Sequence, residues 1–112
     1  MKIELKIGRE KKKIEVHKVS FLGKISGLMF RTHKTRNLLF SFNSDGKRAL
    51  HSWFVFFPFL VLWTDKNYNV QEFRMVKPFS TIVLPKKSFR NVIELPLNNK
   101  NEMLIRFIRG KI

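Results

Sequence analysis

The central stretch HSWFVFFPFLVLWTD (residues 51–65) decides the fold class of this 112-residue chain. From Trp53 to Trp63 it holds eleven consecutive uncharged and almost wholly apolar residues, whereas a helix that crosses a membrane needs about 20. Pro58, in the middle of the run, would remove a helical hydrogen bond and clash with the preceding turn. The stretch is therefore predicted to be extended, and no transmembrane segment is expected.

As a strand, this stretch is apolar on both faces. Alternate residues of a strand share a face, so Trp53, Phe57 and Val61 lie on one side and Leu62 on the other. A strand with two apolar faces has to be covered on both sides, which predicts that these four side chains are nearly inaccessible to solvent. Because proline cannot donate to a sheet ladder, Pro58 is expected at a bulge, a bend or an edge.

The flanking sequence predicts a small all-β domain over residues 1–112, of the sandwich or barrel type with one or two short helices. Alternating hydrophobic residues and turn-forming residues mark the expected elements. These are strands at 3–7 and 12–18, which form a hairpin, a helix at 20–30, strands at 38–42, 70–76 and 91–95, turns at 43–46 and 65–69, and a final helix at 99–107.

The charge balance is extreme, with 23 Lys and Arg against 8 Asp and Glu and a formal net charge of +15. Such an excess creates a positive potential that attracts polyanions. Tyr68 and Phe89 are the expected exposed stacking residues, although neither an RNA-recognition hexamer nor a zinc finger is present. The polyanion-binding candidates form two basic clusters, one of Lys11, Lys12 and Lys13 and the other of Lys86, Lys87 and Arg90. A third basic cluster consists of Arg106, Arg109 and Lys111. At least two of the three clusters are hypothesised to lie on the same face of the protein.

Several segments together resemble the domain of unknown function 192 family, also called uncharacterised protein family 0127. They are GLMFR (27–31), LLFSF (38–42), HSWFVFFPF (51–59), an Asp-led turn and VIELP (92–96). The resemblance extends from Ile3 to the C-terminus and implies a compact β-sandwich or barrel-like domain, without implying an activity. The positions that match the family motifs are Gly27, Arg31, His51, Trp53, Pro58, Asp65 and Glu94.

The chain departs from the family pattern at two acidic positions. Leu60 stands where the family usually has an Asp two residues after the proline, and Lys111 replaces the Asp of the closing Gly-Asp turn. An inward carboxylate on the late strand needs a partner, so Arg31 and Glu94 are expected to form a structural ion pair. A role for Arg31 as an anion ligand is the minority alternative, and His51 is expected to be a hydrogen-bonded strand histidine.

The sequence shows no catalytic or metal-binding constellation. It lacks cysteine, and its three histidines, His17, His33 and His51, lie far apart, whereas a metal site needs three or four convergent ligands. No Ser-His-Asp elbow, Gly-rich phosphate loop or carboxylate pair is recognisable. No catalytic residue, metal or cofactor is predicted, and an enzymatic role is left open but not favoured.

The favoured function is a non-enzymatic binding or accessory module. Its basic surface would dock a polyanion such as nucleic acid, or an acidic protein partner. The alternative is a small-molecule or enzymatic role in a cleft near His51, Trp53 and Arg31. The N-terminal sequence lacks an apolar signal-peptide region, so a cytoplasmic location is expected, and the oligomeric state is left open.

Overall fold

The structure is a computed structural model that describes residues 1–18, 36–46, 58–77 and 85–110, with the backbone alone described at 43 and 44. These ranges are dominated by strands, so the expected all-β class is confirmed. The described elements are β1 (Lys2–Ile7), β2 (Glu10–Glu15), β3 (His17–Lys18), β4 (Leu38–Gly46), β5 (Phe59–Thr64), β6 (Val70–Val76), β7 (Phe89–Pro96) and α2 (Glu102–Arg109).

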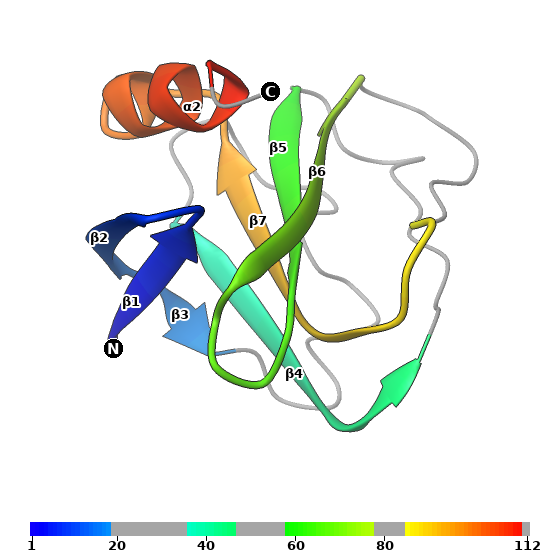
Figure 1. Cartoon of the computed structure of the whole chain (residues 1–112). Coiled ribbons are helices and arrows are strands. Elements are labelled where there is room, and N and C mark those ends of the chain that lie inside the picture. The colour runs from blue at the N-terminus through cyan, green and yellow to red at the C-terminus, as the bar shows by residue number, and fades with distance from the viewer. Residues whose placement is uncertain (19–35, 47–57, 78–84, 111–112) are drawn as a thin grey trace.

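Five strands form one sheet in the order β3-β4-β7-β5-β6 (Figure 1). Neighbouring strands in it run antiparallel, apart from β3 and β4, which are parallel. β1 and β2 form a separate antiparallel hairpin. Its turn starts at Gly8, whose φ of 62° suits a residue without a side chain. The predicted N-terminal hairpin is confirmed, although β2 ends at Glu15 and the chain then enters β3.

β5 holds the second half of the apolar stretch and lies between β7 and β6 in the sheet. All six of its residues are buried, and Val61 and Leu62 are fully inaccessible to solvent, as predicted. Leu60 and Leu62 pack into one hydrophobic cluster, which we call the first cluster, whereas Phe59 and Val61 pack into the second cluster on the opposite face. The strand begins directly after Pro58, which agrees with the expected break at that residue.

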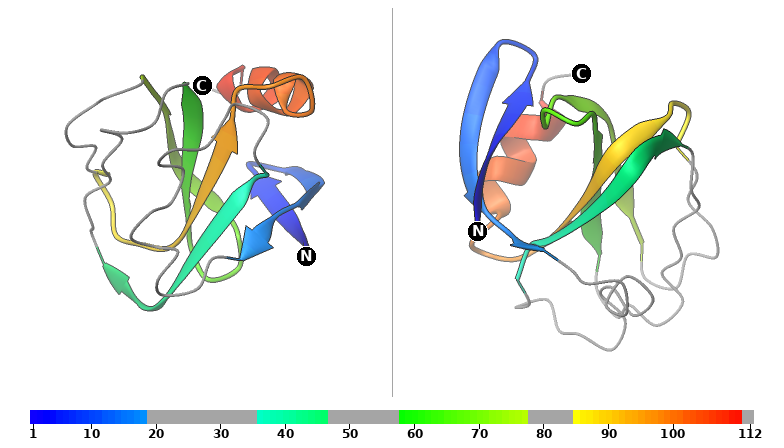
Figure 2. Two further views of the ribbon diagram at one scale, coloured as in Figure 1. Left: turned by 180° about the vertical axis from the view of Figure 1, so that it is seen from behind. Right: turned by 90° about the horizontal axis from the view of Figure 1, so that it is seen from below.

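The hairpin and α2 cover one face of the five-stranded sheet (Figure 2). Their apolar side chains, among them Leu5, Ile14 and Ile108, pack with Leu60 and Leu62 of β5 in the first cluster. The second cluster lies on the other face, where β4, β5, β6 and β7 contribute its side chains. The sheet therefore separates two apolar layers, and the hairpin is joined to the helix through the first of them.

The final helix starts later than predicted. The sequence predicts it at 99–107, but α2 spans Glu102–Arg109 and its N-cap is Asn101. The backbone N–H of Asn101 donates to both the carbonyl and the side-chain Oδ1 of Asn98, so a turn precedes the helix. Ile105 and Ile108, three residues apart, are buried on the core side.

The predicted turn at 43–46 is wrong. β4 continues to Gly46, which pairs with Phe89 of β7, and the register shifts between Ser41 and Gly46. Pairing with a strand that is remote in sequence carries β4 past its turn-forming residues, and the irregular register accommodates them. Local turn chemistry is thus overridden by a long-range partner.

Some expectations concern residues outside the described ranges. The helix predicted at 20–30 and the burial of Trp53 and Phe57 are among them. Within the described ranges, the structure contains no helix of the length and apolarity that crossing a bilayer requires.

Candidate functional site

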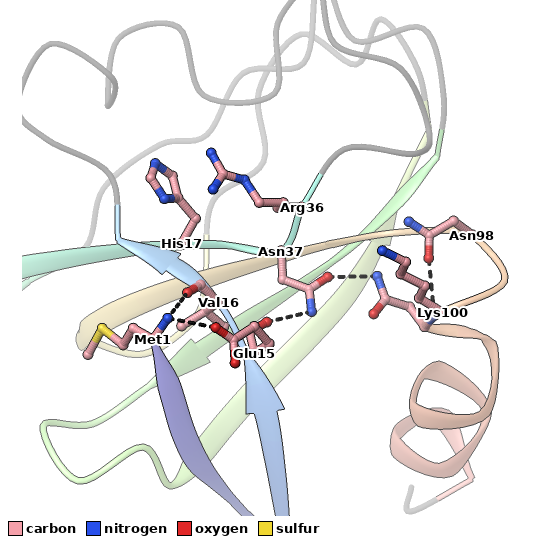
Figure 3. A pocket seen from close by; sticks show the side chains of 9 residues that line it. Met1, Glu15, Val16, His17, Arg36, Asn37, Asn98 and Lys100 are labelled. Atoms are coloured by element: carbon pink, nitrogen blue, oxygen red, sulfur yellow. Dashed lines mark hydrogen bonds and ion pairs between the residues drawn. The ribbon is translucent and has the colours of Figure 1, made fainter.

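A groove lies between β2 and α2, and we call it the β2–α2 groove. Its main cleft, of about 540 Å³, is lined by residues 12–15 of β2 and by Met103, Leu104 and Phe107 of the helix. A smaller cleft of about 180 Å³ adjoins it, reaches Arg36 and His17, and shares the residues at the junction (Figure 3). The junction residues are Glu15, Asn37, Lys100 and Asn101.

Two asparagines bridge the groove at this junction. Asn37 Nδ2 donates to the carbonyl of Glu15 over 3.0 Å (Figure 3). Asn101 Nδ2 donates to Asn37 Oδ1 over 2.7 Å and to the carbonyl of Pro96 over 2.8 Å. Asn101 is buried, so its amide is satisfied inside the protein. This asparagine bridge ties β2 to the segment that precedes α2 and fixes the width of the groove.

Asn101→Ala is expected to lower the free energy of unfolding by about 1–3 kcal/mol, because buried partners lose their hydrogen bonds. The measurement is urea unfolding. Asn99→Ala is the matched control, since Asn99 is exposed and such substitutions usually change stability by less than about 0.5 kcal/mol. Equal losses in the two variants would show that the asparagine bridge contributes nothing.

The rim of the groove is basic. Lys12, Lys13 and Lys100 are exposed along the main cleft, and Arg36 is exposed in the smaller one. The acidic residue among the described lining residues is Glu15, whose carboxylate accepts a hydrogen bond from the Met1 amino group over 2.8 Å. That contact lowers the pKa of Glu15 below its ordinary value. The groove thus carries an excess of positive charge.

The wall of the groove on the helix side is apolar. Met103 is 84% exposed, and Leu104 and Phe107 are half-buried beside it. Lys12 Nζ lies 4.6 Å from the centre of the Phe107 ring, within the range of a cation–π contact. Ile14 faces the same space from β2. A ligand in this groove would meet cations along the rim and apolar atoms below them.

The structure does not bring the two basic clusters of the polyanion prediction together. Lys11, Lys12 and Lys13 are exposed on β2. The segment just before β7, which carries Lys86 and Lys87, lies across the molecule from the β1–β2 hairpin in all three views (Figures 1 and 2). Arg90, beside it, is ion-paired with Asp45 at 3.2 Å. In the third cluster, Arg106 is ion-paired with Glu102 and Arg109 is exposed, while Lys111 lies outside the described residues.

Neither Tyr68 nor Phe89, the two residues expected to stack on bases, has an aromatic ring that is fully exposed to solvent. The prediction is wrong for Phe89, which is 1% exposed, because β7 points this side chain into the second cluster. Tyr68 is half-buried and packs against the first cluster from the turn before β6. An aromatic ring that stacks on a base needs an open face, and neither ring offers one fully.

Among the motif residues, Asp65 has a clear structural role. Its Oδ1 accepts hydrogen bonds from the backbone N–H groups of Asn67 and Asn69, and its Oδ2 accepts one from Asn69 Nδ2. Partial burial raises the pKa of Asp65, but these hydrogen bonds and nearby Lys6 outweigh it and lower the pKa overall. Asp65 thus organises the turn predicted at 65–69, in which Tyr68 has a φ of 64°.

Glu94 is a buried acid in an apolar setting. It is 3% exposed and lies opposite Leu38 of β4 and Val61 of β5, which are themselves buried. Among the described residues, no donor lies within hydrogen-bond distance of its Oε1. Burial raises the pKa of Glu94 from 4.5 to about 8, so this environment favours the protonated acid at neutral pH.

The other motif candidates fall outside the described residues. They are Gly27, Arg31, His51 and Trp53. The Arg31–Glu94 pair therefore stays a prediction. Within the described ranges, no three His, Cys, Asp or Glu side chains gather as they would around a metal ion.

Sequence reasoning missed several residues of the groove. Asn37, Lys100 and Asn101 come from two loops far apart in sequence, and no local pattern connects them. The available signal is the polar run NNKN at 98–101, which overlaps the start of the helix predicted at 99–107. Its asparagines do precede the helix, but Asn101 also reaches across to Asn37.

Comparisons with known proteins show the fold through solved structures and the family through a family profile. A crystal structure from Sinorhizobium meliloti 1021, described as a "putative transcription regulator", has 17% identity and a TM-score of 0.76, covering 92% of this chain and 84% of that one. A protein of unknown function from Novosphingobium aromaticivorans DSM 12444 has 13% identity and a TM-score of 0.75, covering 92% and 76%. No curated protein matches the chain. The profile of DUF192, "Uncharacterized ACR, COG1430", matches residues 3–106, so the chain belongs to the DUF192 family.

Proposed function

We propose that this domain is a non-enzymatic binding module that docks an anionic partner in the β2–α2 groove. The convergence of cations on one groove carries the proposal. Lys12 and Lys13 come from β2, whereas Lys100 comes from the loop before α2, more than eighty residues later. The fold thus gathers basic residues that the sequence separates.

The packing around the groove supports a stable binding surface. The asparagine bridge fixes the position of β2 against the helix segment, and Ile14, Ile105 and Ile108 anchor the two walls in the first cluster. A preorganised surface loses less conformational entropy when it binds. The alternative function, a small-molecule or enzymatic cleft near His51, Trp53 and Arg31, rests on residues outside the described ranges.

The proposal is tested by fluorescence anisotropy with two labelled polyanions, a single-stranded thymidine 20-mer and poly-glutamate. The groove variant is Lys12→Glu/Lys13→Glu/Lys100→Glu. The matched control is Lys66→Glu/Lys86→Glu/Lys87→Glu, which changes the net charge equally at exposed residues outside the groove. At least one probe is expected to bind in a salt-dependent way, as charge neutralisation requires.

The groove variant is expected to lose this binding at ~0.15 M salt, where non-specific dissociation constants are typically 10⁻⁴–10⁻⁶ M. If the thymidine probe is the one bound, the log–log salt slope should flatten by about 2 units, since each single-strand phosphate contributes about 0.7. The control variant should keep most of its affinity. Equal losses in the two variants would mean that net charge alone attracts the probe, and the proposal would then be wrong.

A further inference from the structure

The hydrogen-bond pattern of the hairpin shows which backbone groups of β2 face away from β1. Met1 and Val16 exchange two backbone hydrogen bonds, of 2.8 and 3.1 Å. In an antiparallel pair such mutually bonded residues alternate with residues whose N–H and C=O groups point outward. The regular register from Lys2↔Glu15 to Ile7↔Glu10 therefore turns the backbone groups of Lys11, Lys13 and Glu15 toward the outer edge.

At one end of this outer edge, Asn37 makes hydrogen bonds of the kind that a neighbouring strand would make. The carbonyl of Glu15 accepts a hydrogen bond from Asn37 Nδ2, and the N–H of His17 donates to the carbonyl of Asn37 over 2.8 Å. Among the described strands, β2 pairs with β1 alone. The outward N–H and C=O groups of Lys11 and Lys13 thus continue the edge that Asn37 occupies, and Lys13 lines the β2–α2 groove.

The positive charge of this edge indicates which class of partner it can bind. A second copy of β2 would place lysine side chains opposite lysine side chains, and like charges directly opposite one another are destabilising. A single-stranded nucleic acid would need an open aromatic face, but the groove's own aromatic ring, Phe107, lies under the ammonium of Lys12. An acidic polypeptide would bring negative charge to the basic rim, and it does not need an open aromatic ring for binding.

We propose that the β2–α2 groove binds an acidic polypeptide segment in an extended conformation, which adds a third strand to the outer edge of β2. Its backbone pairs with the outward groups of Lys11 and Lys13. Successive side chains of a strand point to opposite sides, so apolar residues at alternate positions rest on Met103 and Leu104 while acidic residues between them meet the lysines. This inference rests on the proposed function and specifies its ligand.

The test uses a labelled eight-residue peptide of alternating Glu and Val and the full chain. The matched peptide has the same sequence with alternate backbone nitrogens methylated, which removes one edge of hydrogen-bond donors and keeps the charge. The unmodified peptide is expected to bind at least ~10-fold more tightly, because edge pairing relies on main-chain hydrogen bonds. It should also slow hydrogen exchange at the amides of Lys11 and Lys13.

Two variants test the same edge from the protein side. Lys13→Pro removes the outward N–H together with the charge, whereas Lys13→Gln removes the charge alone. Proline is tolerated on edge strands, so Lys13→Pro is expected to bind the peptide several-fold more weakly than Lys13→Gln. If Lys13→Pro does not fold, the comparison of the methylated and unmodified peptides with the wild-type chain still tests strand addition.

The outcomes separate the two proposals. Equal affinity for the methylated and unmodified peptides would overturn strand addition but leave an anion-docking groove in place. Binding of the thymidine 20-mer at the groove, with no binding of the unmodified peptide, would overturn the acidic-polypeptide ligand alone. Peptide affinity that survives the triple lysine reversal would overturn the groove itself, and with it the proposed function.

Discussion

Leu60→Asp is expected to remove most of the stability of the domain. Leu60 is fully inaccessible to solvent and faces the first cluster, opposite Leu95 and Met75 on the neighbouring strands. Truncation of such a leucine to alanine typically costs about 2–5 kcal/mol. The aspartate would in addition bury a carboxylate that lacks a partner, so the total loss should approach the roughly 5–15 kcal/mol of a typical domain.

The measurement is urea unfolding of the wild type, Leu60→Asp and Leu60→Ala. Leu60→Ala separates the lost packing from the buried charge, and the aspartate variant should be clearly the less stable of the two. Unchanged stability in Leu60→Asp would contradict the account. It would mean that position 60 opens onto a polar pocket instead of the apolar core.

Glu94→Gln is expected to stabilise the protein in alkaline solution and to flatten the dependence of its stability on pH. The buried environment raises the pKa of Glu94 from 4.5 to about 8. Between these values the folded chain keeps a proton that the unfolded chain releases, so stability falls as pH rises. At about 1.4 kcal/mol per pKa unit, the fall amounts to at most about 5 kcal/mol. Glutamine has the shape of the protonated acid and does not titrate.

Urea unfolding from pH 4 to pH 9 checks this expectation. The wild type and Glu94→Gln should have similar stability near pH 4, where glutamate is protonated in both folded and unfolded chains. The variant should be the more stable one near pH 9. The Arg31–Glu94 ion pair predicted from the sequence would reverse the sign, since it lowers the pKa of Glu94 and makes Glu94→Gln destabilising at neutral pH.

Strand β5 shows what the sequence reveals about the fold. Its two apolar faces predict a strand covered on both sides, and Val61 and Leu62 confirm it. The hairpin, the turn at Asp65 and the late strand also follow from local alternation and turn chemistry. These features can be predicted from the sequence because each depends on residues that are neighbours in the chain.

The features that escaped prediction depend on contacts between distant segments. β4 runs through its turn-forming residues because β7 pairs with it. The groove needs Asn37, Lys100 and Asn101 to meet at β2. Charge patterning predicts the lysines of β2 and those before β7 alike, but the segment that precedes β7 lies across the molecule from β2 (Figure 1). Which charges act together is a property of the tertiary structure.

The most direct test of the anion-docking groove is an NMR titration of the ¹⁵N-labelled full chain with poly-glutamate. Backbone amide shifts are expected to concentrate in residues 11–15, at Lys100 and Asn101, and along α2. The same titration of the triple lysine reversal should leave these amides unmoved. Shifts centred on Lys86 and Lys87, or shifts spread evenly over all basic residues, would contradict the account.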